Sequence, residues 1–142
     1  MKKKVLISAC LLGVDCRYDG KNNRLPEEKL RMLMDSFELI PVCPECMGGL
    51  TTPRVPSERR DGGVYSKNGR NVTAEFGRGA EAALHLARLF GADSAILKEN
   101  SPSCGSGRIY DGSFTGTLTE GDGVTAELLK RNGITVTGEK SI

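Results

Sequence analysis

The chain has 142 residues, with 20 basic and 18 acidic side chains and a formal net charge of +2. The charges are interspersed without long runs of one sign, so we expect no nucleic-acid polymer as a partner. The apolar stretch Val5–Leu12 is far shorter than the roughly 20 residues of a membrane-spanning helix, so we expect no membrane partner and a cytoplasmic protein with one domain over residues 1–142.

The first predicted element is a strand over Val5–Ala9, because its residues are nearly all apolar, as in strands covered on both faces. A polar, glycine-bounded segment follows and predicts a loop. Pro26 and the two acids behind it predict a helix to Ser36, since proline lacks the N–H group that a first helical position leaves unpaired. A second strand is predicted over Phe37–Val42.

The middle of the chain, residues 44–71, shows little periodic pattern and is rich in glycine, proline and arginine. We expect a long loop there, and long loops in compact domains are usually functional. Thr73 is typical of a helix N-cap, and apolar residues recur at helical spacing as far as Phe90, where Gly91 predicts the helix end.

The last part of the chain continues the alternation of strands and helices. Its predicted elements are a strand over Ser94–Lys98, a glycine-rich hairpin-like stretch through Gly123, a helix over Val124–Asn132 and a short strand over Ile134–Thr137. This alternation predicts an α/β fold with a small, mostly parallel sheet and flanking helices, in a Rossmann-like three-layer arrangement. Long glycine-rich loops are expected at the carboxyl ends of the strands.

Three of the five cysteines follow predicted strands: Cys10, Cys43 and Cys104. Parallel sheets bind ligands in the crevice beyond the carboxyl ends of their strands. Three thiols placed there can converge on one metal centre. Cys16 lies in the first loop, and Cys46 completes a C-x-x-C motif with Cys43.

Cysteine clusters in a reducing compartment are more often metal ligands or catalytic groups than disulfides. Zinc sites built on cysteine usually show two close pairs, and only Cys43 and Cys46 have that spacing, so structural zinc is not favoured. An iron-sulfur cluster needs thiolates on separate loops and can work with three, which fits the strand-end placement better. Burial as small apolar side chains is the alternative for any single cysteine.

The C-x-x-C motif after a strand also suggests a thioredoxin-like dithiol site. That function needs a helix that begins at the motif. The following segment, residues 47–53, contains two glycines and a proline and disfavours a helix, so we do not expect dithiol exchange.

Glu45 comes two residues after a strand-end cysteine, so its carboxylate can face the same crevice and act as a general base or acid. A solvated loop acid is the alternative. Ser101 and Ser103 flank a proline beside Cys104 and can relay a proton or hold a ligand, although serines in such turns often bond their own backbone.

Charged side chains surround two of the cysteine segments. Asp15 and Arg17 flank Cys16, and the middle loop carries Arg54, Arg59 and Arg60. These groups can bind an anionic or carbonyl-rich substrate, but surface solubility explains them equally well.

Several short motifs occur in one order along most of the chain: Ser8-Ala9-Cys10-Leu11-Leu12-Gly13, Cys16-Arg17-Tyr18-Asp19-Gly20, Cys43-Pro44-Glu45, Gly48-Gly49-Leu50, Pro53-Arg54 and Ser101-Pro102-Ser103-Cys104-Gly105. Together they resemble the thiouracil desulfidase family. The resemblance implies an enzyme that removes sulfur from a thiolated pyrimidine, as a nucleobase or nucleoside, without net redox change. It also implies an oxygen-sensitive 4Fe-4S cluster held by three cysteines, whose fourth iron binds the thiocarbonyl sulfur.

The resemblance implies Cys10, Cys43 and Cys104 as cluster ligands, with Cys16 as a substitute for one of them. Glu45 is the candidate for proton transfer and Ser101 its partner. Ser103, Asp15 and Arg17 are the candidates for substrate binding.

Two other functions use the same residues. One is a metal or redox sensor without catalysis, and the other is a structural zinc domain that binds partners through its middle loop. Release of sulfide from thiouracil distinguishes the enzyme from the sensor, and colour distinguishes iron-sulfur from zinc.

Overall fold

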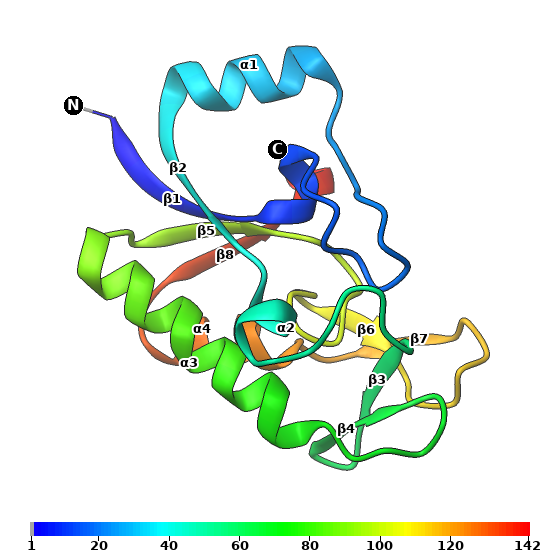
Figure 1. Cartoon of the computed structure of the whole chain (residues 1–142). Coiled ribbons are helices and arrows are strands. Elements are labelled where there is room, and N and C mark those ends of the chain that lie inside the picture. Colours follow the sequence, from blue (N-terminus) through cyan, green and yellow to red (C-terminus); the bar gives the residue numbers. More distant parts are fainter. Residues whose placement is uncertain (1) are drawn as a thin grey trace.

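A computed structural model describes residues 2–142. Its central sheet has four parallel strands in the order β2-β1-β5-β8, which confirms the predicted parallel α/β architecture (Figure 1). The strands are β1 (Lys3–Ser8), β2 (Phe37–Val42), β5 (Ser94–Leu97) and β8 (Thr135–Gly138).

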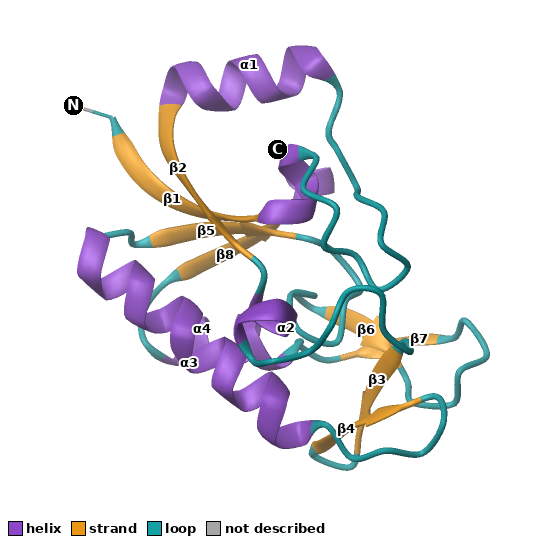
Figure 2. Cartoon of the chain, viewed as in Figure 1, coloured by secondary structure: helices purple, strands orange, loops and turns teal. Residues whose placement is uncertain are grey.

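Helices cover both faces of this sheet and make three layers (Figure 2). Val5 and Ile7 of β1 pack with α1 (Glu27–Ser36) on one face, whereas Leu6 packs with α3 (Thr73–Phe90) and α4 (Val124–Arg131) on the other. Successive strand residues point to opposite faces, so a continuously apolar strand contributes side chains to the hydrophobic cores on both faces of the sheet. Among residues 2–142, no helix combines the length and the apolar character needed to cross a membrane.

The middle region has more regular structure than its sequence pattern predicts. It contains α2 (Pro44–Met47) and the hairpin of β3 (Ser57–Arg60) and β4 (Gly63–Ser66). The hairpin turn is Asp61-Gly62, and both residues have positive φ, 49° and 77°. An Asp-Gly pair favours this type of two-residue turn, so the expectation of a long loop is wrong.

The short helix α2 also corrects the expectation that no helix begins at the C-x-x-C motif. Pro44 is at its first turn, where a missing N–H group costs nothing. The glycines behind the motif end the helix after Met47 rather than prevent it.

Three other short elements complete the chain. They are the 3₁₀ helices η1 (Ala9–Leu12) and η2 (Glu139–Ser141) and the hairpin of β6 (Arg108–Tyr110) with β7 (Leu118–Glu120). The helix α3 begins at Thr73, one residue earlier than the predicted N-cap would place it, so Thr73 is not its cap. The Thr73 hydroxyl oxygen accepts the Val64 N–H at 2.9 Å, and Asn71 Oδ1 accepts the Thr73 N–H at 3.0 Å.

The backbones of α2 and α3 touch at two glycines. A Cβ atom on Gly79 would lie 1.8 Å from the Pro44 carbonyl oxygen. A Cβ atom on Gly48 would lie 1.9 Å from the Glu75 carbonyl oxygen. Real Cβ atoms do not come this close to backbone, so only glycine permits the observed packing of the two helices.

We expect Gly79→Ala to destabilise the fold by about 1–3 kcal/mol, because the added methyl group must push α2 off α3. Gly77→Ala is the matched control on the same helix, since a Cβ atom there meets nothing within 4 Å. It should stabilise the fold by about 0.5–1 kcal/mol through helix propensity. Urea unfolding measures both variants, and equal effects would contradict the role of the contact.

Candidate functional site

A cavity of about 360 Å³ opens at the carboxyl ends of β1, β2 and β5. The connection after β1 leads to α1 on one face of the sheet, and the connection after β5 leads to α4 on the other face. The strands β1 and β5 therefore flank a topological switch point, which is where open α/β sheets bind ligands.

The three strand-end cysteines all line this cavity. Cys10 lies in η1 directly beyond β1, Cys43 follows the last residue of β2, and Cys104 is in the turn after β5. The parallel strands end at one edge, so residues distant in sequence meet there. The structure thus brings together the thiols that the sequence pattern placed at this edge.

The remaining two cysteines differ from each other. Cys16 lines the cavity, and its carbonyl oxygen accepts a hydrogen bond from the Cys43 thiol at 3.9 Å. Cys46 does not line the cavity, and its Sγ lies 3.4 Å from the Thr52 hydroxyl oxygen. Four thiols therefore face one space, and the second cysteine of the C-x-x-C motif lies beside it.

The three strand-end thiols are poorly ionised on their own. Burial raises the pKa of Cys10, and it raises the pKa of Cys104 to about 12. The side-chain interaction with Cys16, together with burial, raises the pKa of Cys43. The same interaction lowers the pKa of Cys16 against the opposing effect of burial. Metal binding requires thiolates, so a bound cationic centre would have to lower these raised pKa values further than the protein does.

The donor set fits a cluster better than a single ion. No group of three or more His, Cys, Asp or Glu side chains in residues 2–142 could hold one metal ion. A 4Fe-4S cluster does not need such convergence, because each cysteine binds a different iron. Thiols arranged around a cavity are therefore compatible with a cluster, and the zinc alternative gains no support.

Glu45 lines the same cavity from α2. Its Oε1 accepts a hydrogen bond from Arg54 Nε at 3.2 Å, and the Arg54 side chain is only 8% exposed. Arg54 also donates to the Cys16 carbonyl oxygen at 2.9 Å, which ties α2 to the first loop. Burial raises the pKa of the Glu45 carboxyl, and the opposing effect of Arg54 is smaller.

The two candidate serines have separate environments. Ser101 lines the cavity, and its Oγ accepts the N–H groups of Ser103 and Cys104, each at 3.1 Å. Ser103 is fully buried, and its hydroxyl lies 2.9 Å from that of Thr125. The structure therefore brings Ser101 to the cavity but not Ser103, which cannot reach a ligand there.

Asp15 and Arg17 also differ in their position relative to the cavity. Arg17 lines the cavity but is already paired, since its Nε donates to Asp19 Oδ1 at 2.8 Å. Asp15 is exposed outside the cavity lining, where its Oδ1 accepts a hydrogen bond from Asn22 at 2.9 Å. Solvation and local turn contacts account for Asp15, so the structure does not support it as a substrate-binding residue.

The sequence patterns name Arg54 only as one of three arginines that can bind a substrate, and they do not name Glu58. The need of a buried acid for a counter-charge is the signal that distinguishes Arg54 from the other two. Glu58, on β3, is 9% exposed and lines the cavity. The Asp61-Gly62 turn is the signal that would have placed Glu58 on a strand.

Comparisons with known proteins identify relatives of the whole chain. A family model described as 2-thiouracil desulfurase matches residues 5–141. The uncharacterized protein YbbK of Bacillus subtilis (strain 168) is 41% identical, with 97% of each chain covered. A solved structure of the [4Fe-4S]-dependent thiouracil desulfidase TudS (DUF523Vcz) is 48% identical with a TM-score of 0.95, over 99% of this chain and 93% of that one. The chain therefore belongs to the 2-thiouracil desulfurase family.

Proposed function

We propose that this protein is a 4Fe-4S-dependent desulfidase that converts a thiolated pyrimidine, thiouracil or a related thionucleoside, to its oxo form. The observation that carries the proposal is that one cavity is lined by the three strand-end cysteines, Glu45 and Ser101. Family membership and the similarity to TudS support it. Water supplies the oxygen, the carbon–sulfur bond breaks and sulfur leaves as hydrogen sulfide, so no electrons are gained or lost.

Cys10, Cys43 and Cys104 are the proposed cluster ligands, because each follows a different strand and faces the common space. Cys16, which also lines the cavity and whose carbonyl oxygen accepts a hydrogen bond from the Cys43 thiol at 3.9 Å, is the alternative ligand. When bound, the cluster supplies a Lewis acid at the iron that has no cysteine ligand.

Glu45 is the proposed general base. Its Oε1 is held by Arg54, whereas its Oε2 has no hydrogen-bond partner among residues 2–142. Every buried side-chain oxygen and nitrogen of that part of the chain has a partner, so Oε2 must lie in accessible space. The cavity is the space that Glu45 lines, and Oε2 can therefore take a proton from water there.

Ser101 is the proposed hydrogen-bond donor to the substrate. A hydroxyl group has one proton and two acceptor lone pairs. The Ser103 and Cys104 N–H groups occupy the acceptor positions of Ser101 Oγ. No group of residues 2–142 accepts its proton, so Ser101 can stabilise negative charge that develops on a substrate atom in the cavity.

The first test is anaerobic reconstitution, with iron and acid-labile sulfide counted per chain and sulfide release measured from 2- and 4-thiouracil. We expect about four of each per chain, as for a 4Fe-4S cluster, together with turnover. Stoichiometric zinc without turnover would support the structural zinc domain. A full cluster without turnover on either compound would support the sensor.

The cysteine pair Cys10 and Cys46 tests the ligand assignment. Cys10→Ser should lose most of the iron, because a proposed ligand at the end of β1 is removed. Cys46→Ser should retain the full iron content, since Cys46 does not line the cavity. Iron analysis and visible absorption after identical reconstitution measure both variants, and a full active cluster in Cys10→Ser would refute the assignment.

Glu45→Gln should keep the visible absorption of the cluster and lower sulfide release by about 10²–10⁴-fold, the usual contribution of a general base. The wild-type kcat/KM should fall as pH drops through the pKa of Glu45, which is raised by burial, because a base must be deprotonated. The midpoint should therefore lie above about 4.3, the ordinary value for glutamate. Loss of the cluster in Glu45→Gln would show that Glu45 is structural instead.

A further inference from the structure

Glu58 is a buried carboxylate of the cavity that has no counter-charge. It lies on β3, is 9% exposed and lines the cavity, but forms no ion pair within residues 2–142. The neighbouring cations are engaged elsewhere. Arg59 donates to Glu127 Oε2 at 2.9 Å, and Arg60 lies over the Tyr65 ring at 4.6 Å.

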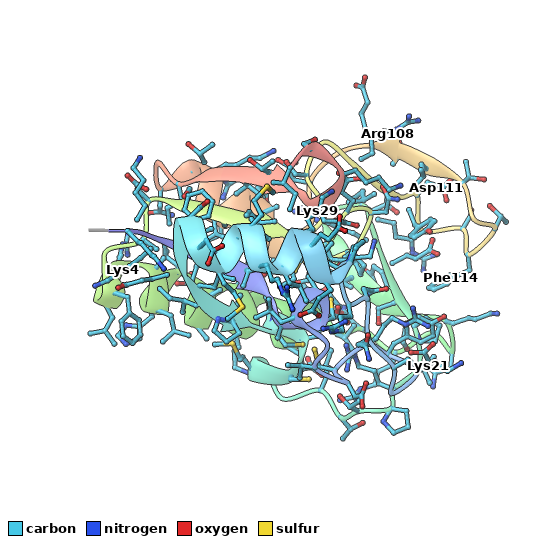
Figure 3. All side chains as sticks on the ribbon, turned by 90° about the horizontal axis from the view of Figure 1, so that it is seen from above. Lys4, Lys21, Lys29, Arg108, Asp111 and Phe114 are labelled. Carbon is cyan, nitrogen blue, oxygen red and sulfur yellow. The ribbon has the colours of Figure 1, made fainter. Side chains whose placement is uncertain are left out.

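The two oxygens of Glu58 have different environments. Oε1 accepts the N–H groups of Gly112 at 3.0 Å and Phe114 at 3.1 Å, so it is fixed by the β6–β7 loop. Figure 3 shows Asp111 and Phe114 on this loop, at the opposite end of the molecule from Lys4. Oε2 has no partner among the described residues.

Oε2 of Glu58 must nevertheless be accessible. No buried side-chain oxygen or nitrogen in residues 2–142 lacks a hydrogen-bond partner. An atom without a partner therefore lies outside the sealed interior, and the open space that Glu58 lines is the cavity. The structure thus presents one rigidly held carboxylate oxygen to whatever the cavity binds.

A carboxylate oxygen can only accept hydrogen bonds, so its partner must carry an N–H or O–H group. A thiolated pyrimidine carries N–H groups on its ring, next to the carbonyl and thiocarbonyl carbons. Such a site also rejects analogues that lack the N–H group, because the buried acceptor of the protein is left unpaired when they bind.

We propose that Oε2 of Glu58 accepts a hydrogen bond from a ring N–H group of the thiolated pyrimidine and so orients the base in the cavity. This inference rests on the proposed function. The two carboxylates then have separate tasks: Glu45, paired with Arg54, moves a proton, and Glu58, held by two backbone amides, recognises the substrate.

Glu58→Gln tests this assignment on the reconstituted protein. The glutamine carbonyl can keep the bonds to Gly112 and Phe114, but its NH₂ group replaces Oε2. That NH₂ group and the ring N–H group of the substrate are both donors, so the hydrogen bond is lost. A hydrogen bond to a charged group predicts a rise of about 10–100-fold in KM for 2-thiouracil and in Kd for uracil, the reaction product. The kcat should stay within about threefold of the wild-type value.

Glu99→Gln is the control for charge, because Glu99 also lines the cavity but is less buried than Glu58 and is held by one backbone N–H group, that of Lys140 at 3.2 Å, rather than by two. It removes the same charge from the cavity and should leave KM and Kd unchanged. An equal effect of the two variants would show a general electrostatic role and overturn the proposal.

Methylated substrates supply a test whose first step uses only the wild-type protein. In the wild-type protein, 1-methyl- or 3-methyl-2-thiouracil should bind more weakly, and the weaker one identifies the ring nitrogen that Glu58 contacts. For that compound Glu58→Gln should cause no further loss, because the interacting pair is already broken. Wild-type affinity for both methylated compounds, or fully additive losses, would overturn the proposal.

The outcomes also separate this inference from the proposed function. Uracil binding that depends on Glu58 without any sulfide release would retain the recognition role and reject the desulfidase. Sulfide release that is insensitive to Glu58→Gln would retain the desulfidase and reject the recognition role.

Discussion

The site depends on the direct backbone contact between α2 and α3. The short helix α2 carries Glu45 and follows Cys43, but four residues cannot hold a helix in place by themselves. Contact with the long helix α3 through Gly48 and Gly79 fixes its position against a large element that is packed on the sheet. Arg54 then joins α2 to the first loop by bonding both Glu45 and the Cys16 carbonyl. Glycines that leave no room for side chains thus determine where a carboxylate and a thiol lie in the cavity.

Polar groups in the cavity differ in how they are balanced, and their proposed tasks follow from this. Glu45 has an arginine, so it is held in place while its second oxygen stays free. Glu58 has two backbone amides and no cation, which fixes an acceptor without neutralising it. The strand-end thiols are partly or fully buried, and a bound metal centre would stabilise their thiolate forms.

The sequence predicts the sheet, its strand-end cysteines and the long helix α3, because these follow from local apolar patterns and from the rule that parallel strands end at one edge. It does not predict the site in full. The Asp61-Gly62 turn was missed although its signal is local, and α2 was missed because proline at a helix start was outweighed by the glycines behind it. The burial of Arg54 and Glu58 depends on contacts between distant segments. So does the position of Ser103, which is buried beside Thr125 and does not line the cavity. No local pattern encodes such contacts.

The separation of Cys10, Cys43 and Cys104 along the chain has a consequence for how the protein matures. Each thiol follows a different strand, and the edge where they meet exists only after β1 has paired with both β2 and β5. A chain emerging from the ribosome would offer the assembly machinery isolated cysteines until the segment around Cys104 had been made and folded. Loading of a cluster on these residues would therefore come after folding, in contrast to zinc fingers, whose metal drives the fold.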